Sequence, residues 1–163
     1  MTNAPAAPCE VRDIECPEDA LVATLTDVWE RSVRATHTFL TENDILGIRP
    51  FLPEVLRGGD HLSVAFRDGR PVAFAVVNGT KLEALFCDPD VRGTGVGSAL
   101  LAHAIDAFGA FRLDVNEQNG QAVGFYLHKG FVQVGRSPLD DAGRPFPTLH
   151  LELPFRLRGL SSK

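Results

Sequence analysis

KLEALFCDPDVRGTGVG, residues 81–97, is the stretch that decides the fold, and a helical run over Ser98–Phe108 follows it. Its apolar first half predicts a strand, and the Asp-Pro-Asp turn ends that strand because proline donates no N–H and aspartate favours turns. Glycines then stand at positions 93, 95 and 97, just before the helix. Glycine has no Cβ, so successive N–H groups can converge on an anion, and the helix N-terminus adds unpaired N–H groups. With the guanidinium of Arg92, this pattern predicts a site for a phosphate group, above all a pyrophosphate.

Two familiar phosphate-binding motifs do not fit these glycines. The P-loop requires a lysine directly after its last glycine, and none follows here. The dinucleotide fingerprint G-x-G-x-x-G would place its third glycine at Ser98 or Leu100. Asp114 does lie about 20 residues downstream, where that fingerprint has an acidic residue, but the glycine spacing excludes the match. A glycine-rich turn that binds nothing is the remaining alternative.

Composition restricts the class of protein. The chain has 163 residues, 44% of them hydrophobic and 23% charged, which is typical of one soluble globular domain. The net charge of −5, without a large cluster of basic residues, argues against a nucleic-acid surface and favours neutral or cationic substrates. No apolar run approaches the ~20 residues of a membrane span. Cys9, Cys16 and Cys87 lack metal-site spacing, so we expect reduced thiols in a cytoplasmic protein with no metal.

The predicted order of elements describes a mixed α/β fold. We expect a disordered leader over residues 1–9, one domain over 10–154 and a frayed tail over 155–163. A helix should begin at Pro17-Glu18-Asp19, and a second, interrupted by two prolines, should span Ile45–Leu56 with Thr41 as a cap. Another helix is expected over Gln121–Lys129. The predicted strands are Glu10–Ile14, His61–Phe66, Pro71–Asn78, Leu82–Cys87, Phe111–Val115, Phe131–Gly135 and Thr148–Leu153.

Two turn signals order the central strands. Asp68-Gly69 and Asn78-Gly79 are typical of tight hairpins, so they predict an antiparallel meander. A helix separates the strand over 82–87 from that over 111–115, which makes these two parallel neighbours through a right-handed crossover. The result is a sheet of six or seven strands, mostly antiparallel, with helices on both faces.

A second motif lies at residues 115–131, VNEQNGQAVGFYLHKGF. It fits N-x-x-A-x-x-x-Y-x-x-x-G-F with Asn119, Ala122, Tyr126, Gly130 and Phe131. Together with R-x-x-G-x-G after a strand that ends in Asp-Pro, it resembles the GCN5-related N-acetyltransferase (GNAT) superfamily, over roughly residues 10–153. Details such as SVRATHTFL at 32–40 are similar to bacterial YjaB-type acetyltransferases, a group linked to acetylation of lysine or other primary amines.

The resemblance implies a GNAT-like fold whose central parallel pair splays apart to admit acetyl-CoA. The first splayed strand would pair with the pantetheine arm as if the arm were another strand. Asn119 would reach the same arm, and Tyr126 would contact the cofactor and protonate the leaving thiolate. The positions that match the family's cofactor contacts are Leu85, Phe86, Cys87, Arg92, Gly93, Thr94, Gly95, Val96, Gly97, Asn119 and Tyr126.

The general base is left open. Asp114 and Glu83 lie on the two splayed strands, where different family members place a carboxylate, and His37 titrates in the right range. Strict strand alternation would put Glu83 on the same face as Leu85. Each candidate also has a structural interpretation, as a salt-bridged edge residue or a helix cap, and a chain of water molecules is a further alternative.

The sequence therefore predicts direct acetyl transfer from acetyl-CoA to a primary amine, which is a small molecule, a protein lysine or an N-terminus. An acyl intermediate on Cys87 is a minor alternative. A CoA-binding sensor without catalysis and a nucleotide-binding module are alternatives from another class. Asp140 and Asp141 either attract a cationic acceptor or form a solvated turn. We expect no nucleic-acid or membrane partner, and a monomer or homodimer.

Overall fold

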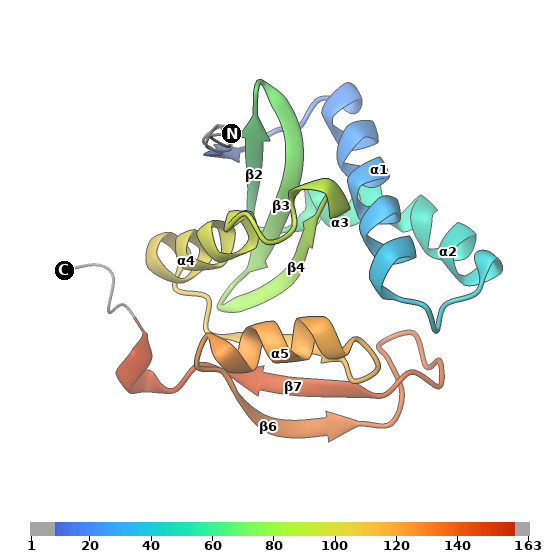
Figure 1. Cartoon of the computed structure of the whole chain (residues 1–163), viewed down its shortest axis with the longest axis vertical. Coiled ribbons are helices and arrows are strands. Elements are labelled where there is room, and N and C mark those ends of the chain that lie inside the picture. The colour runs from blue at the N-terminus through green and yellow to red at the C-terminus, as the bar shows by residue number, and fades with distance from the viewer. Residues whose placement is uncertain (1–8, 159–163) are drawn as a thin grey trace, which may run out of the picture.

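The computed structural model describes residues 9–158, which form one seven-stranded sheet with helices on both faces (Figure 1). The strand order is β1-β2-β3-β4-β5-β7-β6, and every neighbouring pair is antiparallel except β4 and β5. The predicted sheet, meander and parallel pair are thus confirmed. The strands are β1 (Glu10–Ile14), β2 (His61–Arg67), β3 (Arg70–Asn78), β4 (Lys81–Cys87), β5 (Arg112–Asn116), β6 (Val132–Ser137) and β7 (Thr148–Glu152).

The helices connect these strands. They are α1 (Asp19–Thr36), α2 (Glu42–Ile48), α3 (Leu52–Gly58), α4 (Val96–Phe108) and α5 (Gly120–His128), with short 3₁₀ turns η1 (Arg49–Phe51), η2 (Pro89–Val91) and η3 (Phe155–Leu157). The single helix expected over Ile45–Leu56 is two helices joined by η1. Pro50 and Pro53 lie in the first turns of η1 and α3, where a missing N–H costs no hydrogen bond. Within residues 9–158 no helix is both long and apolar enough to span a bilayer.

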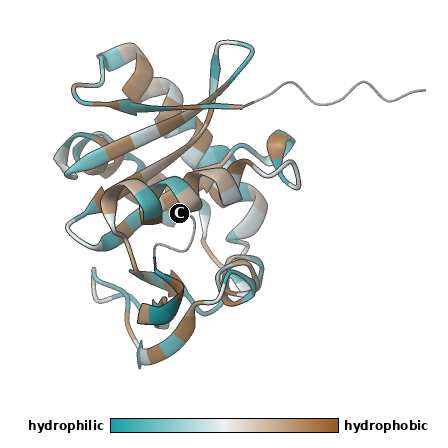
Figure 2. Ribbon diagram, turned by 90° about the vertical axis from the view of Figure 1, so that its left-hand side faces the viewer, coloured by the Kyte–Doolittle hydropathy of each residue, from teal (hydrophilic) through white to brown (hydrophobic). Residues whose placement is uncertain are grey.

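Each face of the sheet has its own hydrophobic core. On one face α1, α2 and α3 pack on β2–β4, and the fully buried side chains there include Leu25 and Phe74. On the other face α4 and α5 cover the sheet through Leu100, Tyr126 and their neighbours. Hydrophobic and hydrophilic segments alternate along the helices, as burial of one helix face requires (Figure 2).

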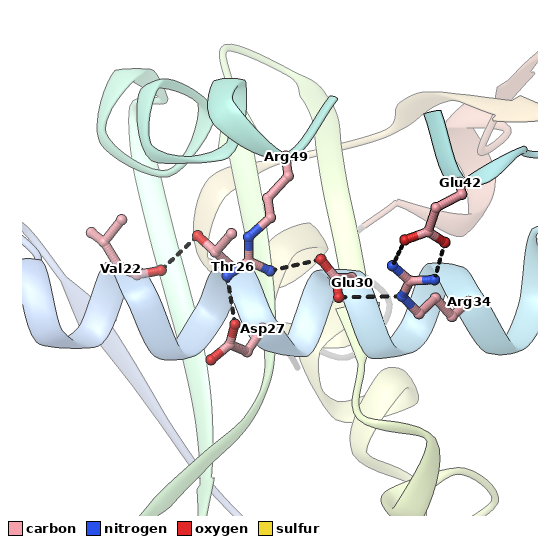
Figure 3. Close-up of polar contacts among 7 residues, drawn as sticks. All are labelled: Val22, Thr26, Asp27, Glu30, Arg34, Glu42 and Arg49. Carbon is pink, nitrogen blue, oxygen red and sulfur yellow. Dashed lines mark hydrogen bonds and ion pairs between the residues drawn. The ribbon is translucent and has the colours of Figure 1, made fainter. Parts of the chain in front are cut away.

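A network of ion pairs fixes α1 against α2 (Figure 3). Both terminal nitrogens of Arg34 in α1 donate hydrogen bonds to the carboxylate of Glu42 in α2, at 2.6 and 2.7 Å, and the Arg34 Nε lies 3.2 Å from Glu30. Arg49 of η1 reaches back to Glu30 and Asp27. Thr41 caps α2 as predicted, in a capping box with Asp44. These contacts hold the short segment between α1 and α2, which contains His37.

The chain ends lie partly outside the described residues. Nearly all of the predicted leader, residues 1–8, and the last part of the tail, residues 159–163, fall outside them. The described start of the tail packs on the domain: the guanidinium of Arg158 lies 3.6 Å from the centre of the Phe111 ring and donates to the carbonyl of Leu153.

Candidate active site

The site begins where β4 and β5 part. The two strands are paired only at Lys81–Arg112 and Leu82–Leu113, and β4 continues to Cys87 with its partner β3 on the other side. Beyond Leu82, the edge of β4 that faces β5 therefore has backbone groups free to pair with an extended ligand. In Figure 1, β4 lies above α5, whereas β7 and β6 lie below α5. The sheet therefore divides at this point.

A β-bulge at Glu83 changes the alternation expected for β4. Val76 is opposite Ala84 and Val77 is opposite Leu82, so Glu83 is an extra residue in the ladder. As a result Leu82 and Leu85 both pack in the core beneath α4 and α5, and the carboxylate of Glu83 lies 3.9 Å from the ammonium of Lys81. The expectation of strict alternation between Glu83 and Leu85 was wrong.

The glycine loop has the geometry of an anion site. Gly93 and Gly95 adopt φ angles of 73° and 88°, a region that side chains with a Cβ rarely enter. α4 begins directly after Gly95. The turn before the loop is held by the buried Asp88, whose carboxylate accepts a hydrogen bond from the Asp90 N–H and forms an ion pair with Arg31 of α1. The backbone N–H groups at the start of α4 are therefore presented from a fixed loop.

A cavity of about 430 Å³ lies between β4, this loop, α5 and the C-terminal end of α1. Every residue predicted to contact the cofactor lines it, with the exception of Thr94. The Thr94 hydroxyl instead donates to the carbonyl of Val91 and accepts a hydrogen bond from Arg67. The lining residues that were not predicted to contact the cofactor are Ser32, Thr36, His37, Val91, Ser98, Gln121, Ala122 and Phe125, of which His37 was predicted as a candidate base.

The donors at this cavity fit a phosphate ligand. Arg92 Nη1 lies 3.4 Å from the side-chain oxygen of Gln121, whereas Nη2 is buried and has no partner among the described residues. An unpaired buried guanidinium nitrogen is costly, so it favours an anion that accepts a hydrogen bond from it. The φ-positive glycines and the start of α4 supply neutral donors around the same charge.

A second cavity of about 120 Å³ adjoins the first. All four predicted catalytic residues, Tyr126, Asp114, Glu83 and His37, line it. The two cavities share part of their walls, and the shared residues are His37, Leu85, Phe86, Asn119, Ala122 and Tyr126. The wall that separates a larger cavity with anion donors from a smaller cavity with carboxylates thus contains the single tyrosine of the chain.

Comparison with known proteins identifies the family. The family described as acetyltransferase (GNAT) domain matches residues 48–153. The chain belongs to the GNAT family. The peptidyl-lysine N-acetyltransferase YjaB of Escherichia coli (strain K12) is 48% identical over 132 residues, which are 78% of this chain and 86% of that protein.

Solved structures agree with this assignment. The solution structure of apo-form YjaB from Escherichia coli superposes with a TM-score of 0.79 and 39% identity, covering 89% of this chain and 97% of that one. The PaiA N-acetyltransferase of Thermoplasma acidophilum, solved in complex with coenzyme A, shares the fold at a TM-score of 0.68 and 20% identity, over 88% of this chain and 99% of that one. The predicted family, the GNAT-like fold and the activity of an acetyl-CoA-dependent N-acetyltransferase are confirmed.

Within this GNAT domain, Tyr126 is held as a neutral phenol. Its residue surface is 7% exposed, it packs against Phe125 and Phe131, and its hydroxyl has no hydrogen-bond partner among residues 9–158. Burial raises the pKa of Tyr126 above its ordinary value of 10, with a smaller contribution from Cys87. The hydroxyl therefore keeps its proton at all physiological pH values.

The hydrogen bonds of His37 assign its tautomer. The Thr36 hydroxyl donates to the carbonyl of Ser32 at 2.8 Å, so its oxygen accepts from His37 Nδ1, 2.7 Å away. Asn119 uses its side-chain oxygen to cap α5, as predicted, and its amide nitrogen lies 3.5 Å from His37 Nε2. Burial lowers the pKa of His37 from 6.5 to about 4. His37 is thus neutral at pH 7, with an unprotonated Nε2 at the shared wall.

Asp114 is already engaged at both oxygens. Its Oδ1 lies 2.6 Å from His150 Nδ1 and its Oδ2 lies 2.9 Å from the ammonium of Lys81. Burial alone would raise the pKa of Asp114, but the hydrogen bonds from His150 and Lys81 outweigh it and the net shift is downward. His150 Nε2 is in turn 2.7 Å from the Ser137 hydroxyl. This order resembles a nucleophilic triad, but neither His150 nor Ser137 lines either cavity.

Cys87 and the acidic loop have simpler roles. Burial raises the pKa of the Cys87 thiol to about 11, so the thiol is protonated and a poor nucleophile at neutral pH. Asp140 accepts hydrogen bonds from the backbone of Ala142 and Arg144, as expected of a residue that forms a turn. These observations weigh against an acyl-cysteine and against Asp140 as a contact for the acceptor.

Proposed function

We propose that this GNAT enzyme acetylates the side-chain amine of a lysine in a protein or peptide, with the acetyl-CoA in the larger cavity and the lysine in the smaller one. The observation that carries the proposal is the unpartnered hydroxyl of Tyr126 in the wall that both cavities share. The name of the 48% identical relative supports lysine as the acceptor. The narrow second cavity suits an unbranched alkyl chain better than a bulky amine.

In the proposed arrangement the pyrophosphate lies on Arg92 and the glycine loop, and the pantetheine arm pairs with Leu85–Cys87. Alternate N–H groups on the free edge of β4 then donate to the thioester oxygen as it gains negative charge. The lysine nitrogen attacks the thioester carbon, and the C–S bond breaks as the carbonyl re-forms. Tyr126 gives its proton to the leaving sulfur, and the proton lost by the amine goes to His37, to a carboxylate or to water.

The amine must lose its proton before it attacks. A lysine side chain with a pKa near 10.4 is only about 0.1% neutral at pH 7.4. His37, Glu83 and Asp114 remain the candidates for this step, and the structure makes them unequal. Both oxygens of Asp114 already accept hydrogen bonds, whereas the Nε2 lone pair of His37 has only a long contact of 3.5 Å with the Asn119 amide, but His37 has a low pKa.

The test is thiol release from acetyl-CoA with lysine peptides whose α-amine is blocked, measured on the wild-type chain and on Tyr126→Phe. We expect kcat of the variant to fall about 100-fold. This is a small effect for the loss of a general acid, because a thiolate is a good leaving group. The dissociation constant of acetyl-CoA, measured by thermal shift, should stay within about twofold because the lost hydroxyl has no partner.

An unchanged kcat in Tyr126→Phe would exclude the acid role. Binding of acetyl-CoA without thiol release, for every lysine peptide and for free amines, would favour the non-catalytic sensor. Acetylation of peptides through the α-amine but never through lysine would replace the acceptor and keep the transferase.

A further inference from the structure

Lys81 is a basic residue placed among the carboxylates of the smaller cavity. It lies at the start of β4, its side chain is 21% exposed, and its ammonium is 2.9 Å from Asp114 and 3.9 Å from Glu83. Burial alone would lower the pKa of Lys81, but the hydrogen bond and charge of Asp114, with the charges of Glu83 and Asp141, outweigh it and raise the pKa. Lys81 is therefore a fixed ammonium behind the acidic wall of this cavity.

One carboxylate oxygen of Asp114 pairs with the ammonium of Lys81, and the other is held in place by a second partner. Oδ1 is held by His150, which is itself oriented by the Ser137 hydroxyl, so the carboxylate cannot rotate freely. Oδ2 faces Lys81. The groups that titrate at or behind this wall are His37, Glu83, Asp114, Tyr126, Lys81 and His150.

An acceptor lysine that enters the smaller cavity presents the same chemical group as Lys81. Both are alkylammonium ions, and the carboxylates that line the cavity are Glu83 and Asp114. Two ammonium ions close to the same pair of carboxylates repel each other, and each must share the hydrogen-bond acceptors. Asp141, which also acts on Lys81, keeps the cluster acidic overall.

Resting on the proposed function, we propose that Lys81 is an internal counter-ion that competes with the acceptor ammonium for Asp114 and Glu83 and thereby sets the affinity for the acceptor. In the empty site Lys81 satisfies the carboxylates. Cationic acceptors bind only to the extent that they displace it or share its partners. The enzyme is thus selective for acceptors that make further contacts outside the cavity, because a simple alkylammonium gains little by replacing Lys81.

The test removes this charge and measures the KM of the acceptor at saturating acetyl-CoA. For a lysine peptide, Lys81→Met should lower KM about tenfold, the effect of one unit charge a few ångströms away at an effective dielectric constant between about 20 and 80. Lys81→Arg, which keeps the charge, should stay close to wild type. Lys81→Gln, which keeps a hydrogen-bond donor but no charge, should behave like Lys81→Met and serves if the methionine variant does not fold.

Two controls separate this effect from a general change in charge or structure. Arg57→Gln also removes one positive charge, but Arg57 lies on α3 and pairs with Asp19 instead of with the carboxylates of the smaller cavity, so KM should not change. A peptide with a neutral aminooxy group in place of the lysine ammonium should show the same KM with wild type and Lys81→Met.

The outcomes distinguish this inference from the proposed function. If the wild-type chain acetylates no lysine peptide, the proposed function fails. If it does, and KM in Lys81→Met and Lys81→Gln is unchanged or raised, the counter-ion role is overturned. An equal change for the cationic and the aminooxy peptide would also overturn it, because a structural effect would not depend on the charge of the acceptor.

Discussion

Acidification from pH 7 to pH 5 should destabilise the fold mainly through His37. The unfolded chain takes up a proton at this residue near pH 6.5, whereas burial lowers the folded pKa to about 4. Between these two values the unfolded state binds more protons, so the stability falls as the pH falls through this window and levels off below it. Across the whole window the free energy of unfolding falls by about 3 kcal/mol, and between pH 7 and pH 5 it falls by about 2 kcal/mol.

The assay is urea unfolding at both pH values for wild type, His37→Gln and the control His128→Gln. The control changes an exposed histidine at the end of α5. Wild type and the control should each lose about 2 kcal/mol between pH 7 and pH 5, and His37→Gln should lose much less. Carboxylates with lowered pKa values, such as Asp13 and Asp114, lose their contribution only at lower pH. An equal loss in His37→Gln and wild type would refute the assignment of His37 as a buried neutral base.

Three further substitutions test the cofactor cavity and the core. Arg92→Gln should weaken acetyl-CoA binding about 10- to 100-fold in a thermal-shift titration, because it removes a charge-assisted contact, and Arg92→Lys should weaken it less. Equal affinity in wild type and both variants would contradict the phosphate site. Gly95→Ala should lower the free energy of unfolding by about 1–2 kcal/mol in urea, because φ is 88° there. Leu25→Ala, at a fully buried position, should cost about 2–5 kcal/mol in the same assay, and a much smaller loss would mean that α1 is loosely packed.

Most of the fold could be predicted because glycine, proline and aspartate mark its boundaries. Asp68 and Gly69 both have positive φ, as the tight hairpin between β2 and β3 requires, and Gly109 ends α4 in the left-handed region. The strand expected over Phe111–Val115 is shifted by one residue, to Arg112–Asn116. The bulge at Glu83 could not be predicted, because it depends on how β3 pairs with β4 and no glycine marks it.

The site could be predicted where its functional residues lie close together along the chain. The glycine loop and the helix that contains Tyr126 each carry a local motif, and the structure brings both to one cavity. The partners of Asp114 could not be found in this way. Lys81 and His150 lie 33 and 36 positions from it along the chain, and only the pairing of β5 with β4 and β7 brings them together.

The pKa values of Lys81, behind the smaller cavity, and of His37, in its wall, shift in opposite directions, and this bears on how the lysine loses its proton. Lys81, among carboxylates, has a raised pKa, so that end of the site favours an ammonium. His37, at the wall shared with the larger cavity, has a pKa lowered by burial, so that end favours a neutral base. A lysine that experienced the burial of His37 would shift from a pKa of 10.4 to about 8 and be roughly 20% neutral at pH 7.4. Movement of the acceptor from the carboxylates towards Tyr126 would then lower the pKa of its ammonium, so that the amine loses its proton without a strong general base. A strong base is then not required of Asp114, which is engaged at both oxygens, or of His37, whose pKa is lowered by burial.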